Sequence, residues 1–535
     1  MATQTTTELS TLSPISTPLS TRKRDTPIPP LQAPHPLSPV LSSHEQSQTT
    51  ILPKGRAILV TIQLCGLLFL GSFTNGIIVV ALPSISTSLS LPKSLFVWPT
   101  SSYYLAAGTC LLLGGSLADV LGNKRINLVG SLLSAIFTFA CGVARTGNEI
   151  IAFRALQGVT YAAVMPSGVS IVSTSLEEGR PRNMGFGCLG FSQPLGFCFG
   201  LVMGGVFTDT VGWRPACYFA GAVSAVLCGM GWWVLPGGVR GNQGVSRWKR
   251  MSGEIDWVGL GLASSGLAMF SYTLAALSAD IDSIKQPSSI ALLTIAGLCL
   301  PAFAGWMHRQ EKRNRIALIP NSLWGSHVFT SACIMVLLSN ALANCMEVYS
   351  SLFFQEVQLS SAMTASLQVI PSLIAGVITS ILTGMFVHRI PVLWTLLASS
   401  LLSTVAPLLM ALIRTDQPYW ENAFFGQILT PISCDLLFTV GLLIVSDTYP
   451  KHMQALGGAV FNTCAQIGSA IGLSVTQVIA SSVTAMEEEE GHQSPEGLMK
   501  GYRVAFWVMF GWMVFVCLVC LVGMRRVGRI GLKRD

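Results

Sequence analysis

Apolar runs of roughly 20 residues recur along most of this chain, and they limit its fold more than any other feature of the sequence. A bilayer has a hydrocarbon core of about 30 Å, and a helix of this length is needed to span it. Lipid offers the backbone no hydrogen-bond partners, so each run must be helical. Only 11% of the residues are charged, whereas soluble proteins carry about 25%. We therefore expect an all-α polytopic membrane protein.

The apolar pattern predicts fourteen transmembrane helices. They are expected near residues 57–82, 95–115, 125–144, 149–174, 184–208, 216–236, 256–277, 289–307, 327–352, 362–386, 392–413, 423–446, 455–482 and 502–524. Most of the 32 lysines and arginines fall in alternate connections, which places both termini in the cytoplasm and the acidic run Glu487–Glu490 outside. Omitting the pair at 256–307 leaves this charge pattern intact, so charge alone does not separate twelve helices from fourteen.

Residues 1–53 and 525–535 flank the apolar region. The first segment is rich in Ser, Thr and Pro and has no apolar run, which predicts a disordered cytoplasmic tail, and the second is a short cytoplasmic tail. The formal net charge of +7 is explained by bases that face anionic inner-leaflet lipid, so we expect no nucleic-acid partner. The fourteen cysteines show neither paired nor metal-ligand spacing, so we expect no metal site.

An acid and two bases occupy the short connection that follows the second predicted helix. This segment contains Gly115, Asp119, Gly122, Lys124 and Arg125. Opposite charges in a tight loop can form a gating latch between helix ends, and Asp119 can also face a helix N-terminus, where the dipole favours an anion. The alternative is an ordinary positively charged loop on the cytoplasmic side.

Arg154 lies within the helix expected at 149–174. An arginine in a span costs about 2.5–3.5 kcal/mol on insertion scales, so it usually faces a polar interior. Gln157 and Tyr161 follow at i+3 and i+7 and share its helix face. The alternative is an arginine that extends to the outer headgroups.

Small residues recur on the helices at 184–208 and 362–386. The first carries Gly187, Gly196, Gly200, Gly204 and Gly205, and small residues recur there every four positions, at Ser192, Gly196, Gly200, Gly204 and Thr208. The second carries Ser372, Gly376, Ser380 and Gly384. Small residues let membrane helices approach closely. We predict that these two helices cross closely through their small residues and seal one side of a central cavity.

Two carboxyl groups lie inside predicted spans, Glu347 at 327–352 and Asp435 near the middle of 423–446. An ionisable residue within a span is a functional hypothesis by default. The alternatives are a position near the outer surface for Glu347 and a structural hydrogen bond for Asp435. Amide side chains recur at helical spacing in the same half of the chain. They are Asn340, Asn344, Asn462 and Gln466.

Three of these motifs resemble those of the major facilitator superfamily. The segment from Gly115 to Arg125 is similar to its signature loop, G-x-L-a-D-x-x-G-x-K/R, and Arg154-x-x-Gln157-Gly158 is similar to its helix-4 motif. The glycines resemble the antiporter motif G-x8-G-x3-G-P-x2-G-G, although Leu201 stands in place of the proline. The chain thus resembles the fungal fourteen-helix drug:proton antiporters of this superfamily.

The resemblance implies two six-helix halves, at 57–236 and 327–524, with a linking helix pair at 256–307. It implies a site near the bilayer midplane between the halves. It also implies alternating access, in which inward proton flow drives export of a small organic compound such as a drug, toxin or secondary metabolite. Drug exporters carry an acid on the first helix, whereas this chain has Thr74, followed by Asn75.

The proton must then be carried elsewhere. Asp119 is expected near cytoplasmic water, which leaves the carboxyl groups within spans. Asp435 is the deeper one, and burial favours the protonated carboxyl, so it is the first candidate for proton coupling, before Glu347. Arg154, which the resemblance links to proton transfer, is the expected charge partner. The expected substrate cavity contains Asn75, Gln157, Tyr161, Asn340, Asn344, Asn462 and Gln466.

The sequence contains no nucleotide-binding loop of the type G-x-x-x-x-G-K-S/T and no catalytic signature, so we expect neither a cofactor nor enzymatic activity. The expected partners are the organic substrate, protons and the lipid bilayer, and we expect a monomer in the plasma membrane or, alternatively, the vacuolar membrane. An uptake carrier or a small-ion transporter for ammonium or borate, with the same fold, remains open, as does a non-transporting sensor. The sequence does not name the substrate.

Overall fold

The computed structural model describes residues 52–92, 95–177, 179–237, 255–279, 285–313, 315, 317–386, 389–415, 417–489, 495–525 and 527–528. The predicted tail at 1–53 lies outside this part of the chain except for its last two residues, and the tail at 525–535 is described only in part. The described residues form long helices and contain no strand.

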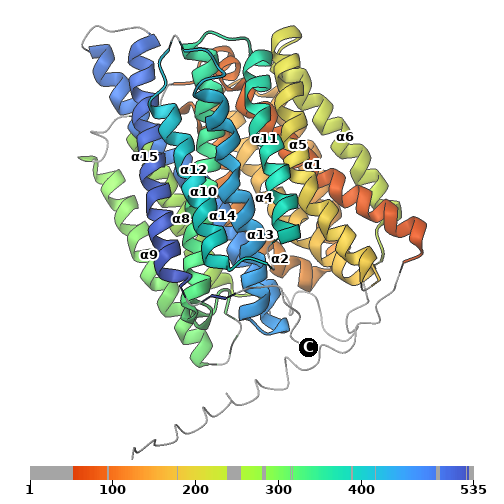
Figure 1. The fold of residues 1–535 in the computed structure, drawn as a ribbon. Coiled ribbons are helices and arrows are strands. Elements are labelled where there is room, and N and C mark those ends of the chain that lie inside the picture. Colours follow the sequence, from red (N-terminus) through yellow and green to blue (C-terminus); the bar gives the residue numbers. More distant parts are fainter. Residues whose placement is uncertain are drawn as a thin grey trace, which may run out of the picture. The chain divides into compact units, whose positions relative to one another are not determined.

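Six helices make up the first half of the fold. They are α1 (Lys54–Leu89), α2 (Trp98–Leu121), α3 (Asn123–Val143), α4 (Gly147–Ser175), α5 (Arg180–Thr210) and α6 (Trp213–Val234). Within this half α1 packs on α5 and α6, α2 packs on α4, and α3 packs on α4 and α6. Figure 1 shows these helices, from red to yellow, grouped on one side of the membrane domain.

Two helices and a short turn link the halves. They are α8 (Trp257–Ala279), α9 (Pro287–Lys312) and the 3-10 helix η3 (Asn321–Gly325). The helix α8 contacts both α2 of the first half and α14 of the second, and Ser264 donates a hydrogen bond to the Thr109 carbonyl of α2 at 3.2 Å. The linking pair therefore lies against the seam between the halves.

The second half begins with α10 (His327–Leu352), which continues as a π-helical turn, η4 (Phe353–Val357). The others are α11 (Ala362–Phe386), α12 (Val392–Ala411), α13 (Ala423–Thr448), α14 (Lys451–Glu489) and α15 (Pro495–Gly523). Here α10 packs on α13, α14 and α15, and α12 packs on α13 and α15. The halves meet where α2 lies on α14 and α5 lies on α11.

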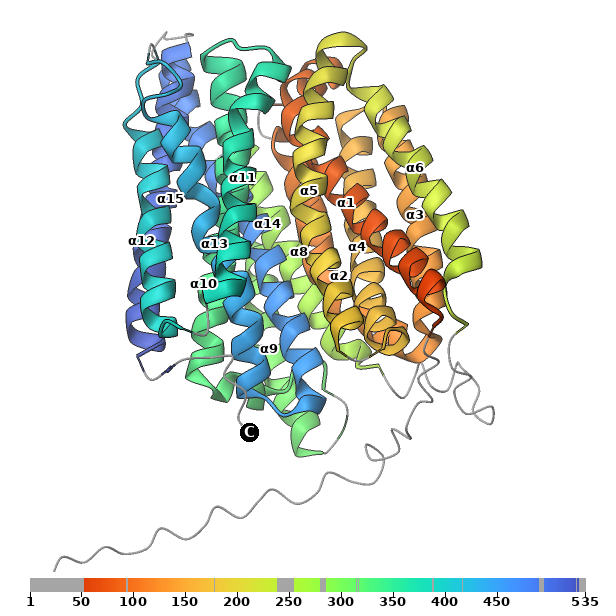
Figure 2. The same ribbon diagram turned by 45° about the vertical axis from the view of Figure 1, so that its right-hand side comes forward.

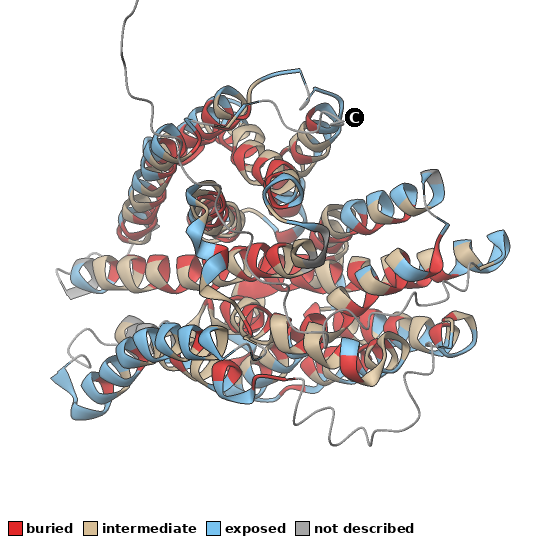
Figure 3. Ribbon diagram, turned by 90° about the horizontal axis from the view of Figure 1, so that it is seen from below, coloured by how far each residue is buried: buried red, intermediate tan, exposed pale blue. Residues whose placement is uncertain are grey.

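The prediction of fourteen helices is confirmed in the described part of the chain. Thirteen of them are long and apolar enough to cross a bilayer, and the described apolar stretch of α8, Trp257–Phe270, is shorter. Large apolar side chains cover the outward surface, among them Trp233 with 83% and Val226 with 70% of its surface exposed. Figure 3 shows exposed residues on the outward faces and buried ones where helices meet. This surface is suited to lipid.

The segment that was expected to form a loop after the second helix is mostly helical. Gly115 and Asp119 lie inside α2, which ends only at Leu121. Gly122 alone makes the turn into α3, with a φ of 100° that side chains other than glycine rarely adopt. The second glycine of this motif thus has a conformational role, whereas Gly115 faces Pro166 of α4 at ordinary contact distance.

Candidate functional site

Arg154 is the most deeply enclosed charged side chain among the described residues, with none of its surface exposed. Its Nε donates to the Pro99 carbonyl at 2.8 Å, one terminal nitrogen donates to Gln157 Oε1 at 2.7 Å, and the other donates to Asn75 Oδ1. The guanidinium also lies over the Tyr103 ring, 4.6 Å from its centroid. Neutral oxygens and an aromatic face thus compensate for the desolvation of this charge.

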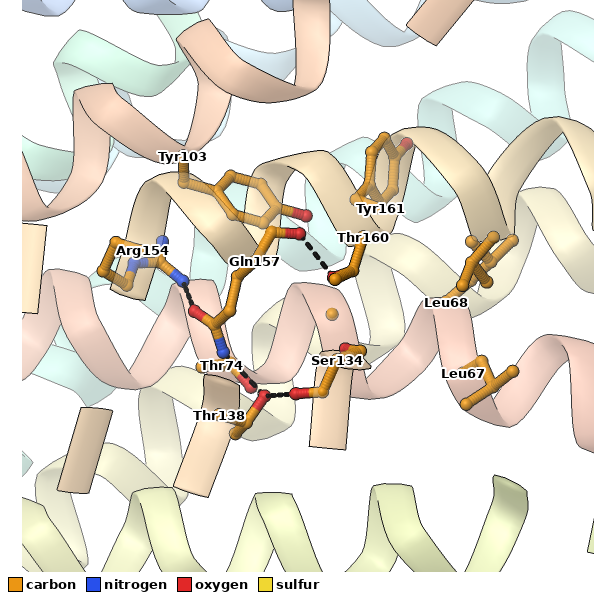
Figure 4. Close-up of a pocket in the computed structure, with 12 residues that line it drawn as sticks. Leu67, Leu68, Thr74, Tyr103, Ser134, Thr138, Arg154, Gln157, Thr160 and Tyr161 are labelled. Carbon is orange, nitrogen blue, oxygen red and sulfur yellow. Dashed lines mark hydrogen bonds between the residues drawn. The ribbon is translucent and has the colours of Figure 1, made fainter. Parts of the chain in front are cut away.

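Gln157 extends this network within the first half. Its Nε2 donates to Thr138 Oγ1 at 2.6 Å, and Thr138 in turn donates to the Ser134 carbonyl at 2.7 Å (Figure 4). The predicted shared face of Arg154 and Gln157 is therefore real, and it points to the interior of the first half. The alternative of an arginine that extends to the outer headgroups is wrong.

A cavity of about 20 Å³ adjoins this network. Its lining includes Thr74, Tyr103, Thr138, Gln157 and Tyr161 (Figure 4). A volume of this size holds about one water molecule, so it is far too small for an organic compound. In this conformation Asn75 and Gln157, both expected in the substrate cavity, are instead committed to Arg154.

Tyr161 lies where the two halves meet. Its hydroxyl donates to Gln193 Oε1 of α5 at 3.1 Å and accepts from Gln466 Nε2 of α14 at 3.5 Å. Asn462, one helical turn before Gln466, lies 3.9 Å from the Met165 sulfur of α4. Tyr161, Asn462 and Gln466 are thus brought together across the seam. Gln193 was missed, because a single glutamine beside a proline carries no pattern.

The two carboxyl groups of the second half are close enough to interact with each other. Glu347 projects from α10 and Asp435 from α13, and Tyr104 of α2 lies near Glu347. Both side chains are surrounded by protein, yet each keeps some accessible surface. Neither carboxyl group has a hydrogen bond or ion pair with another described residue.

The depths of these carboxyl groups in their helices differ. Asp435 follows the start of α13 by about 18 Å at the usual helical rise, which is near the middle of that helix. Glu347 lies ten residues before Val357, where the span formed by α10 and its π-helical continuation ends. Its neighbours Asn340 and Asn344 are half-buried, and Asn344 donates to Ser469 Oγ of α14 at 2.9 Å. Both carboxyl groups thus lie inside membrane spans, and the expectation that Asp435 is the more deeply buried of the two stays a prediction.

Arg154 does not contact either carboxyl group in this conformation. Its donors are directed to Pro99, Gln157 and Asn75. The electrostatic neighbours of Asp435 and Glu347 do not include it. A role as charge partner therefore requires a rearrangement and stays a prediction.

The basic side chains of Lys124 and Arg56 both contact the end of α6. Lys124 Nζ donates to the Leu235 carbonyl at 2.7 Å and to the Trp232 carbonyl at 3.2 Å. Arg56 donates to the Val234 carbonyl at 3.0 Å, so both bases neutralise the C-terminal end of α6. Arg125 is exposed, and Asp119 has a partner among its neighbours.

The glycines of α5 pack closely, although not where they were expected to. A Cβ on Gly196 would lie 2.2 Å from the Phe69 carbonyl oxygen of α1, and one on Gly200 would lie 2.1 Å from that of Phe73. A Cβ on Gly204 would lie 2.8 Å from the Cα of Ile77, which is also on α1. The prediction that this stripe packs on the helix at 362–386 is wrong, because it packs on α1.

Three other glycines of these helices have different surroundings. Only Gly205 meets α11, where an added Cβ would lie 2.7 Å from the Met363 Cα. Gly187 has nothing within 4 Å of such a Cβ and takes no part in packing. On α11, Gly376 faces the Asp435 carboxyl and Pro431 of α13. The two helices do cross, and there the C-terminal end of α5 meets the N-terminal end of α11.

Comparison with known proteins identifies the family of this fold. The sequence matches the Major Facilitator Superfamily over residues 64–344 and 328–533. The chain belongs to the major facilitator superfamily. The relative MFS-type transporter 1 of Pyricularia oryzae is 37% identical over 94% of this chain and 89% of its own length.

Other relatives within the superfamily carry more specific names. A low affinity ammonium transporter of Saccharomyces cerevisiae is 27% identical and covers 77% of this chain and 78% of its own length. The efflux pump terJ of Aspergillus terreus is 25% identical and covers 82% of both chains. This major facilitator is therefore a multi-pass membrane transporter with efflux pumps among its relatives.

Solved structures agree on the fold. A bacterial homologue of the human lysosomal transporter Spinster, in an inward-facing and occupied conformation, superposes with a TM-score of 0.62. The two are 13% identical, and the match covers 89% of this chain and 98% of the other. At this identity the likeness establishes the major facilitator fold and nothing about substrates.

Proposed function

We propose that this transporter exports a small organic compound in exchange for protons. The observation that carries the proposal is the pair Glu347 and Asp435, two carboxyl groups inside membrane helices with accessible surface and no ion pair to a described residue. Carboxyl groups in such positions can bind and release protons during transport. The efflux pumps among the relatives support the export direction.

In the proposed cycle, the proton and the organic compound compete for the site of one carboxyl group. Protonation of Asp435 from outside and binding of the organic compound from inside would exclude each other, so proton entry drives export. Asp435 is the first candidate because it lies near the middle of α13, where the halves of this fold enclose their ligands. Glu347, nearer the end of α10, is the second. We place the protein in the plasma membrane, with the vacuolar membrane as the alternative.

The first experiment compares the metabolites released by cells with and without the protein, which identifies an exported compound. Uptake of that compound into inside-out vesicles under an imposed proton gradient then measures coupling. Asp435→Asn is expected to abolish gradient-driven uptake while one-for-one exchange of the compound continues. The matched control is Asp447→Asn, an exposed carboxylate at the C-terminal end of the same helix. Full gradient-driven uptake by Asp435→Asn would transfer the assignment to Glu347→Gln.

A second candidate function is favoured by one relative. The Saccharomyces cerevisiae protein named as a low affinity ammonium transporter matches most of this chain, and carboxyl groups without basic partners suit a small cation. Radiolabelled methylammonium uptake by whole cells distinguishes this function. Methylammonium uptake that depends on the protein favours ammonium transport. Uptake equal to that of cells lacking the protein rules out this function and favours export of an organic compound.

A further inference from the structure

Asp209, at the end of α5, joins the two halves of the transporter. Its carboxylate accepts a hydrogen bond from the Ala362 backbone nitrogen at 3.2 Å and another from the Met363 nitrogen at 2.9 Å. Ala362 and Met363 are the first two residues of α11, in the other half of the fold. The cap of α11 is therefore partly built by a residue from the opposite half.

The first N–H groups of a helix have no partner within the helix, and the helix dipole favours an anion beside them. Ser361, just before α11, accepts from the Thr364 nitrogen at 3.2 Å and so satisfies the third of these groups. Asp209 satisfies the first two. The capping of α11 is thus complete only while α5 lies beside it.

The backbones are close enough for this contact because of Gly205, one turn earlier on α5. A Cβ there would lie 2.7 Å from the Met363 Cα and 3.0 Å from the Ala362 carbonyl oxygen. Figure 2 shows α5 and α11 side by side along this edge of the molecule. Any larger residue at 205 would hold the two helices apart.

A second contact joins the halves at the same end. Gln355, in the π-helical turn after α10, donates to the Val80 carbonyl of α1 at 3.0 Å and to Ser351 Oγ at 2.9 Å. The turn η4 and the start of α11 are joined by a short connection in which Leu359 has a φ of 54°. One connection between α10 and α11 therefore presents both contacts to the first half.

We propose that Asp209 is a latch that holds the transporter closed on the side that the charge pattern assigns to the outside. Opening on that side must separate α5 from α11, which breaks both hydrogen bonds of Asp209 and leaves the first two N–H groups of α11 without their protein partner. The side chain is exposed, so water replaces these bonds at small cost and the latch is weak. The inference rests on alternating access, but not on proton coupling.

The test measures how often the outer side opens. Ser366 is fully buried against Gly205 in the contact between α5 and α11, so Ser366→Cys reports opening by its reaction with a membrane-impermeant maleimide added outside. The protein without this substitution gives the background from its fourteen natural cysteines. We expect Asp209→Asn to raise the labelling rate about five-fold, equivalent to about 1 kcal/mol of lost anion–dipole interaction.

The controls separate the latch from other effects. Glu421→Gln removes an exposed carboxylate from the loop before α13 and should leave the rate unchanged. Asp209→Glu keeps the charge and should label no more than twice as fast as the parent. An unchanged rate in Asp209→Asn would overturn the proposal, and if this variant does not reach the membrane, Asp209→Ser is judged by the same criterion. No substrate or gradient is present, so failure of proton-coupled export would not affect this result.

Discussion

Arg154 illustrates how a charge is kept inside this membrane protein. Three bonded nitrogens and a ring contact surround it, and each bonded partner is a neutral oxygen. A planar guanidinium can reach Pro99, Gln157 and Asn75 together, whereas the three donors of a lysine ammonium all lie on one nitrogen. The planar geometry of the guanidinium, rather than its charge alone, therefore allows Arg154 to join these parts of the first half.

We therefore expect Arg154→Lys to lower the free energy of unfolding by about 1–3 kcal/mol, because Asn75 and Gln157 lose buried hydrogen bonds, and to abolish transport. Thermal unfolding in detergent and vesicle transport measure the two effects. Arg145→Lys, at an exposed arginine just before the same helix, is the control. Parent-like unfolding of Arg154→Lys would show that the planar geometry of the guanidinium is dispensable.

The sequence identified some of these residues and not others, for a physical reason. Arg154 and Gln157 were found because they lie three residues apart on one helix face. Thr138 and the Pro99 carbonyl were not, because they come from other helices and a carbonyl leaves no trace in the sequence. Asp209 was missed in the same way, since its partners are the backbone nitrogens of Ala362 and Met363.

At the scale of helices, the glycine stripe of α5 shows what a small-residue pattern contains. Spacing of four residues predicted a flat face and close approach, which is confirmed, but it did not name the partner helix. The partner is α1, whose Phe69 and Phe73 carbonyls fill the space beside Gly196 and Gly200. The pattern describes only one of the two packed surfaces. It therefore cannot predict the partner helix, because several helices of the bundle could pack against such a face.

The stripe gives a prediction at this scale. Gly200→Ala would place a methyl group 2.1 Å from the Phe73 carbonyl oxygen, so the backbones of α1 and α5 must separate. We expect a destabilisation of about 1–3 kcal/mol from overpacking and a large loss of transport. Gly187→Ala, on the same helix with open space beside it, should behave as the parent does. Thermal unfolding in detergent and transport are measured for both variants. If the two variants behave alike, the role of this motif is not the packing of α1 on α5.

For the whole molecule, hydrophobic length and charge predicted the architecture well because bilayer thickness fixes how long a spanning helix must be. The predicted helix at 327–352 has the bounds of α10, whereas α1 and α14 extend past their predicted ends. Those extensions are more polar and continue as helix beyond the apolar run, so hydropathy could not detect them. How the halves meet, through α2 with α14 and α5 with α11, depends on side-chain shape and was not predictable from periodicity.

The orientation of the bundle in the membrane is the remaining prediction, and it rests on charge. Lysines and arginines concentrate in the connections on the same side as both termini. Positively charged connections stay on the cytoplasmic side during membrane insertion. A cysteine at Glu487, at the end of α14, should therefore react with an impermeant maleimide in intact cells. A cysteine at Glu177, exposed between α4 and α5, should react only after the membrane is permeabilised. The reverse labelling pattern would mean that the molecule has the opposite orientation in the membrane. Asp209 would then lie on the cytoplasmic side, and its contact with α11 would close the inner side of the transporter.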